Sequence, residues 1–94
     1  MSAPNPQKTI EHLALLLKEE RKKRGLSLTE VGTRAGLHYV AVLRIENSER
    51  VPSIDTLLRI SFALGLSLPR LLTRAIKMAE SDDSGNECST SGSL

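Results

Sequence analysis

The chain has 94 residues, of which 39% are hydrophobic and 2% aromatic, so it is long enough for one domain with a small aliphatic core. All 13 basic residues lie between Lys8 and Lys77, whereas four of the 11 acidic residues lie beyond them, a distribution that fits a polyanion binder or, equally well, a solubilising surface. The one cysteine, Cys88, excludes an intramolecular disulfide and favours a cytoplasmic location. We expect no signal peptide, because the N-terminus lacks a basic region followed by an apolar stretch, and no membrane span, because the longest apolar run, residues 13–17, is far too short.

Residues 1–8 are expected to form a flexible arm, because they contain prolines and no periodic pattern. A first helix is predicted over residues 9–24, and Gly25 ends it. Leu15 and Leu16 widen the apolar surface of this helix beyond a single face. We expect this additional apolar surface to be buried, either by the last helix or by a second subunit.

Two short helices separated by a tight turn are predicted next. Ser27 is a good N-cap and Glu30 completes a capping box, so a helix begins at the following residue. Gly36 supplies the left-handed turn that ends this helix. A second helix is predicted over residues 39–46, and the order of helix, glycine turn and helix is typical of a helix-turn-helix.

A fourth amphipathic helix is predicted between the cap Ser53 and the terminating Gly65. We expect it to be a core helix. The residues that follow one helical track are Ile54, Leu57, Leu58, Ser61 and Gly65, and those that widen it are Ile60, Phe62 and Leu64.

A fifth helix is predicted over residues 68–79, with Ser67 as its cap and an apolar stripe that either covers its own monomer or forms a dimer. Residues 80–94 are rich in Ser, Gly and acidic residues, cannot bury enough apolar surface to become ordered, and are expected to form a disordered tail.

An ordered set of marks extends from residue 21 to residue 72. They are Arg21, Gly25-Leu26-Ser27, Val31-Gly32, Ala35-Gly36-Leu37, Val42, Ile45-Glu46-Asn47, Pro52-Ser53 and Leu64-Gly65-Leu66. This set resembles the lambda-repressor and Cro-like (XRE-type) helix-turn-helix regulators, with the helix-turn-helix at residues 27–46. The resemblance implies an all-α, five-helix DNA-binding domain over residues 9–79, acting on double-stranded DNA as a transcriptional regulator without a cofactor. It also implies that Arg21 turns inward and pairs with Glu46.

By the same resemblance, residues 39–46 form the recognition helix. The residues expected to contact bases are His38, Tyr39, Val40, Leu43 and Arg44. Arg44 either donates a bidentate pair to guanine or only contacts phosphate or solvent. Val40 and Leu43 either touch thymine methyl groups or are partly buried. Asn47 follows where relatives usually have glycine, and we expect it to adopt the left-handed conformation.

Phosphate contacts and a two-fold dimer complete the expected DNA complex. The residues expected to contact phosphate are Lys22, Ser27, Arg34, Asn47 and Arg50. A homodimer is expected on an approximately palindromic operator, because one helix-turn-helix touches only a few base pairs. The residues expected at its interface are Leu15, Leu16, Leu72 and Ile76.

The sequence shows no pattern of an enzyme or a metal site. The two histidines lie on different predicted helices, Cys88 lies in the tail, and no glycine-rich phosphate loop is present. An alternative remains open: the same fold serves as a protein-interaction module or antitoxin, with Leu28, Val40 and Leu43 as an apolar docking patch for a partner protein.

Overall fold

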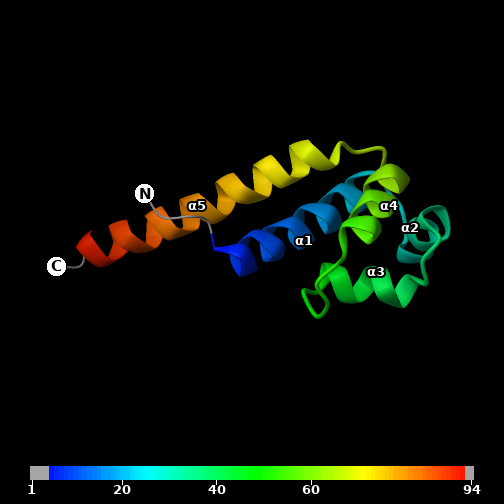
Figure 1. The fold of residues 1–94 in the computed structure, drawn as a ribbon, viewed down its shortest axis with the longest axis horizontal. Coiled ribbons are helices and arrows are strands. Elements are labelled where there is room, and N and C mark those ends of the chain that lie inside the picture. Colours follow the sequence, from blue (N-terminus) through cyan, green and yellow to red (C-terminus); the bar gives the residue numbers. More distant parts are fainter. Residues whose placement is uncertain (1–4, 93–94) are drawn as a thin grey trace.

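The computed structural model describes the backbone of residues 5–92 and the side chains of residues 5–82. This part of the chain forms five helices: α1 (Pro6–Lys23), α2 (Leu28–Ala35), α3 (Tyr39–Glu46), α4 (Ile54–Leu64) and α5 (Leu68–Gly92). Helices α1 and α5 lie side by side as a long pair, and α2, α3 and α4 gather at one end of it (Figure 1). The all-α, five-helix architecture is therefore confirmed.

Helix α1 begins earlier than the sequence pattern predicted. The side chain of Asn5 is the N-cap: its Oδ1 accepts hydrogen bonds from the backbone N–H groups of Gln7, at 2.9 Å, and Lys8, at 3.3 Å. Pro6 occupies the first turn, where its missing N–H costs nothing. The end of the expected arm is thus helical, and residues 1–4 lie outside the described residues.

The core is aliphatic and draws on every helix. Its buried side chains are Leu13, Leu16, Leu17, Val31, Ala35, Val42, Ile45, Leu57, Ile60, Leu64, Leu68, Leu71 and Ala75. Leu16 is only 2% exposed, so its expected place in a dimer interface is wrong. The reason is that α5 folds back along α1 and supplies, within one chain, the cover that the widened apolar surface of α1 requires.

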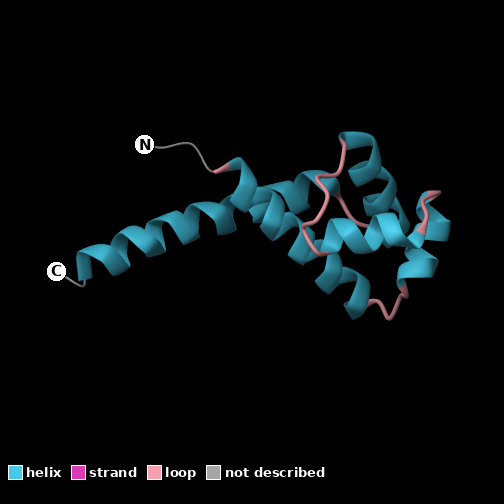
Figure 2. Cartoon of the chain, turned by 90° about the horizontal axis from the view of Figure 1, so that it is seen from below, coloured by secondary structure: helices cyan, strands magenta, loops and turns pink. Residues whose placement is uncertain are grey.

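Helix α5 extends past its expected end at Ala79, and its backbone is helical to Gly92 (Figure 2). The expectation of a disordered tail from residue 80 therefore differs from the described backbone. One contact explains the first added turn: His12 on α1 pairs with Asp82 on α5. Once a helix is anchored by packing, each further residue adds a hydrogen bond at little cost. The side chain of Cys88 lies outside the described residues.

Helix α4 is only partly the core helix that was expected. It buries the face that carries Leu57, Ile60 and Leu64. Three other apolar residues that were expected in the core, spaced four apart, point toward solvent, because they lie on a different side of the helix. Their exposed fractions are 64% for Ile54, 37% for Leu58 and 74% for Phe62.

Within the described residues, no single helix is long and apolar enough to cross a membrane; α4 and the first part of α5 reach that length and composition only together, across a bend of 109°.

Candidate nucleic-acid interface

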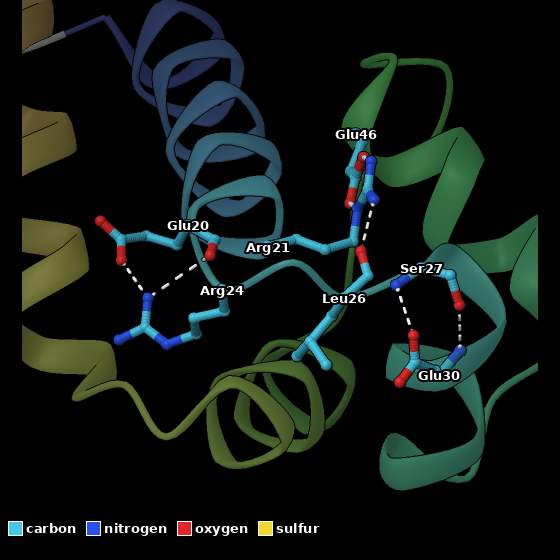
Figure 3. Close-up of polar contacts among 7 residues, drawn as sticks. All are labelled: Glu20, Arg21, Arg24, Leu26, Ser27, Glu30 and Glu46. Carbon is cyan, nitrogen blue, oxygen red and sulfur yellow. Dashed lines mark hydrogen bonds and ion pairs between the residues drawn. The ribbon is translucent and has the colours of Figure 1, made fainter.

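The start of α2 is held by the expected capping box. The Ser27 hydroxyl oxygen accepts a hydrogen bond from the backbone N–H of Glu30 at 3.0 Å, and the Glu30 carboxylate accepts one from the N–H of Ser27 at 3.0 Å (Figure 3). The bonds from Ser27 lower the pKa of Glu30. A phosphate at this helix start would therefore meet the remaining N–H groups of the first turn beside the negative charge of Glu30.

The turn between α2 and α3 depends on two glycines. Gly36 ends α2 with φ of 72°, in the left-handed region that glycine adopts without strain. Gly32 lets α2 approach the start of α3 closely: a Cβ placed there would lie 2.7 Å from the carbonyl oxygen of Leu37 and 3.3 Å from the backbone nitrogen of Tyr39. The angle between the two helices therefore relies on the absence of a side chain at position 32.

The frame that positions α3 includes the predicted ion pair between Arg21 and Glu46, which the structure contains. Nε of Arg21 donates to Oε2 of Glu46 at 2.7 Å, and its Nη2 donates to Oε1 at 3.0 Å (Figure 3). Nη1 donates to the carbonyl oxygen of Leu26 at 2.9 Å, in the segment that leads into α2. The side chains are only 12% and 4% exposed, so a single guanidinium connects α1, the start of α2 and the end of α3 away from water.

A second buried carboxylate lies near the end of α1, in the mostly charged segment 18–24. Glu20 is 7% exposed and pairs with Arg24, Lys23 and Arg74. The hydrogen bond from Arg24 lowers the pKa of Glu20, and the nearby cations add to this effect, whereas burial opposes it. The missed signal was that Glu20 continues the apolar stripe of α1, seven residues after Leu13.

The outer face of α3 presents a mixed polar and apolar surface. His38, Tyr39 and Arg44 are exposed, whereas Val40 and Leu43 are partly buried. His38 is the N-cap: its Nδ1 accepts a hydrogen bond from the backbone N–H of Val40 at 3.2 Å. The rings of His38 and Tyr39 stack with centroids 4.9 Å apart, so the start of the helix carries a paired aromatic surface.

The five residues expected to contact phosphate are all exposed, and they lie on several different segments of the chain. They are Lys22 at the end of α1, Ser27 at the start of α2, Arg34 near its end, and Asn47 and Arg50 after α3. Lys22, Arg44 and Arg50 form no ion pair within residues 5–82, so their charges are available to a ligand. The side-chain amide of Asn47 donates to the Glu49 carboxylate at 3.4 Å.

The left-handed residue after α3 is Ser48 rather than Asn47, so that expectation is wrong. Asn47 has φ of −87° and ψ of 6°, whereas Ser48 has φ of 60°. The N–H of Ser48 donates to the carbonyl of Ile45 at 3.1 Å, and that of Glu49 to the carbonyl of Arg44 at 2.8 Å. This pattern of a Schellman turn places the left-handed conformation one residue after the cap, which is Ser48 here.

The structure buries some of the residues expected at a dimer interface and exposes others. Leu16 is buried in the core, and Leu72 is half-buried against it. Leu15 and Ile76 are 45% and 38% exposed and stay accessible to a partner. Most of the apolar stripe of α5 is therefore used inside one chain, where it packs against α1.

The apolar docking patch that the protein-interaction hypothesis requires exposes little surface. Leu28, Val40 and Leu43 are each partly buried, and Leu28 packs against the core. No group of three or more His, Cys, Asp or Glu side chains that could hold a metal ion occurs among the described residues.

Comparisons with known proteins agree with this geometry. Residues 17–71 match the helix-turn-helix family. The chain is 34% identical over 68 residues to the ImmF control region 10 kDa protein of Bacillus phage phi105, covering 72% of this chain and 76% of that protein.

Two solved structures have similar folds. The restriction-modification controller protein C.AhdI from Aeromonas hydrophila superposes with a TM-score of 0.61 at 28% identity, covering 68% of this chain and 94% of that one. The clp gene regulator ClgR from Corynebacterium glutamicum superposes with a TM-score of 0.76 at 20% identity, covering 87% of each chain. The second similarity, at its low identity, concerns the fold alone.

Proposed function

Since the chain belongs to the XRE-type helix-turn-helix family of DNA-binding transcriptional regulators, we propose that it binds a specific, approximately palindromic operator as a homodimer and controls transcription there. The relatives are a phage control-region protein and a restriction-modification controller, which supports a controlling role. We place this regulator in the cytoplasm, where a lone cysteine is stable in reduced form.

The observation that carries the proposal is the exposed face of α3. His38, Tyr39 and Arg44 project from a helix whose position is held by the Gly32 contact on one side and by the Arg21–Glu46 pair on the other. A helix presented in this way fits the major groove, where base edges carry a sequence code. Arg44, exposed and without an ion pair in the described residues, is suited to guanine O6 and N7.

The side chains around α3 account for the sequence-independent part of binding. Lys22, Arg34 and Arg50 are exposed cations at the end of α1, near the end of α2 and after α3, and Ser27 and Asn47 supply exposed polar groups. Contacts of this kind fix the register of a protein on the duplex, while base contacts select the sequence. In a two-fold dimer the recognition helices would occupy successive major grooves about 34 Å apart.

Arg44→Ala tests this assignment, with Arg70→Ala as a matched control, because Arg70 is an exposed cation on α5. A preferred site is first selected from random 30-bp duplexes with the wild-type protein, and fluorescence anisotropy then measures Kd on this site and on unselected DNA. Arg44→Ala should lose about 1–3 kcal/mol on the selected site and much less on unselected DNA. The control should bind both as the wild type does.

Two results would contradict the proposal. Equal losses on both DNAs would restrict Arg44 to phosphate contact. A wild-type affinity that does not weaken as salt rises would exclude a phosphate-bound complex altogether, since counterion release makes log K fall linearly with log salt.

A further inference from the structure

A cluster of basic side chains lies where the end of α1 meets the first half of α5, and the proposed DNA contacts do not use it. This basic cluster consists of five exposed cations, Lys23, Arg24, Arg70, Arg74 and Lys77. Residues 8–79 carry 13 basic and seven acidic side chains, so their net charge is +6. The basic cluster, together with the buried Glu20 beside it, accounts for +4 of this charge. Most of the net positive charge of the domain therefore lies outside the recognition surface.

Glu20 holds three of these cations together. Its Oε2 lies 3.7 Å from Nζ of Lys23 and 3.6 Å from Nη1 of Arg74. Its Oε1 pairs with Arg24. One carboxylate cannot neutralise three cations, so this group keeps a charge of +2.

Along α5 the cations form a row. Arg70, Arg74 and Lys77 are spaced four and three residues apart, which places them on one side of the helix over about 10 Å. Residues 68–79 contain no acidic residue. Within the part of the chain that the structure describes, Arg70 and Lys77 form no ion pair, so both charges are available to a ligand.

The basic cluster faces away from the recognition helix. Figure 3 shows Glu20 and Arg24 on one side of the end of α1, whereas Arg21 points to the other side, toward α3. Helix α5 packs against α1 and α4, and α1 lies between it and α3 (Figure 1). A duplex bound to α3 would therefore leave the basic cluster accessible.

A hollow of about 450 Å³ opens beside the row of cations. It is lined by the turn between α4 and α5, by Leu66 and Leu71, and by Glu20, Arg70 and Arg74. Its walls combine apolar side chains with two guanidinium groups, whose planar geometry matches carboxylates. A rigid, convex duplex cannot fill such a hollow, whereas one side chain of a peptide can.

We propose that the basic cluster binds an acidic segment of a partner protein. Carboxylates of this segment pair with Arg70, Arg74 and Lys77, and an apolar side chain between them enters the hollow beside Leu66. Glu20 stays in place, because it holds the cations against α1. Electrostatic complementarity of this kind steers association and selects acidic partners. The inference goes beyond the proposed function, since it gives the regulator a second surface that is available with or without DNA.

Fluorescence anisotropy of a labelled acidic peptide tests this surface on the full chain without DNA. The probe is a 12-residue peptide in which Asp alternates with Ser around one central Leu, and its control has Asn in place of each Asp. The wild type should bind the Asp peptide at least about tenfold more tightly than the Asn peptide. The difference should shrink as salt rises, because both surfaces are exposed.

Charge reversal locates the binding surface. Arg70→Glu combined with Lys77→Glu should weaken binding of the Asp peptide at least about tenfold. Arg44→Glu combined with Arg50→Glu is the matched control, because it changes the net charge equally, on exposed cations of α3 and the segment after it. Its affinity for the peptide should stay close to that of the wild type at about 0.15 M salt, where charges more than about 8 Å apart are largely screened.

A milder variant keeps the test decisive even if the double charge reversal fails to fold. Arg70→Ala removes one charge and creates none, at an exposed site without an ion pair in the described residues. It should weaken binding of the Asp peptide by about two- to fivefold, as the loss of one exposed ion pair does. Circular dichroism checks that each variant stays helical.

Three results would overturn the proposal. The wild type could bind the Asp and Asn peptides equally, which would leave the cations without a role. The two double variants could lose the same affinity, so that net charge rather than the basic cluster decides. Unselected DNA could displace the Asp peptide from Arg44→Glu/Arg50→Glu, which would make the basic cluster a second nucleic-acid surface.

Failure of this proposal is distinct from failure of the proposed function, because the peptide measurements contain no operator. Specific DNA binding by a chain that does not distinguish the two peptides would refute only the acidic partner. Binding of the Asp peptide through Arg70 and Lys77, by a chain that binds neither selected nor unselected DNA, would refute only the DNA-binding role.

Discussion

Replacing Arg21 by methionine is expected to destabilise the domain strongly. Arg21 makes two hydrogen bonds to Glu46 and one to the carbonyl of Leu26, and the side chain of Glu46 is 4% exposed. Arg21→Met keeps much of the side-chain volume but leaves the Glu46 carboxylate buried without its partner. Breaking a buried pair in this way costs about 3–5 kcal/mol.

This loss is a large part of the stability of a small domain, which is typically about 5–15 kcal/mol. For a domain of this size, each kcal/mol shifts Tm by roughly 4–8 °C. We therefore expect Tm of Arg21→Met to fall by more than about 10 °C. Affinity for DNA should fall as well, because the pair fixes the end of α3 against α1.

Urea unfolding at neutral pH, followed by circular dichroism, measures the loss. Glu46→Gln should also be destabilised, and Arg21→Met combined with Glu46→Leu should recover part of the loss, because no buried charge is then left unpaired. Lys23→Met is the control: Lys23 pairs with Glu20 at 3.7 Å, but its side chain is 74% exposed. Its cost should stay below about 1 kcal/mol.

The reasoning would be refuted if Arg21→Met cost no more than Lys23→Met. It would also be refuted if the loss of stability of the double variant, relative to the wild type, equalled the sum of the losses of Arg21→Met and Glu46→Leu measured singly. Additive losses would mean that the two side chains do not interact, whatever their distance.

Three further predictions concern backbone and charge. Ser48→Gly should stabilise the domain by about 0.5–1 kcal/mol in urea unfolding, because glycine relieves the φ of 60°; lower stability would show that the hydroxyl matters more than the backbone. Gly32→Ala should raise helix propensity yet destabilise by about 1–3 kcal/mol, since its Cβ would lie 2.7 Å from the carbonyl of Leu37; a rise in Tm would contradict that close approach. Because folding lowers the pKa of Glu20, its stabilising effect is complete above the ordinary glutamate pKa of about 4.3 and is lost as pH falls through the lowered value. The free energy of unfolding of Glu20→Gln should therefore be lower than that of the wild type at neutral pH and should decrease less on acidification. If the two free energies instead changed in parallel with pH, this account would be contradicted.

The sequence was sufficient for features that depend on neighbours in the chain. A capping box needs only Ser27 and Glu30 three residues apart, and a glycine such as Gly36 ends a helix through its own backbone freedom. Local signals of this kind predicted the start of α2 and its approximate end, the approximate extent of α3, and the starts of α4 and α5. The Arg21–Glu46 pair came from the resemblance to a known family, since no local pattern connects residues so far apart.

Tertiary structure decided which apolar faces are buried. Periodicity finds the apolar residues of α4, but Ile54, Leu58 and Phe62 are exposed because the rest of the chain packs against another side of the helix. The reverse holds for Leu16 and Glu20, which are buried because α5 returns along α1 and covers them. Burial depends on which helices meet and at what angle, and that is a property of the whole packed chain rather than of any segment in it.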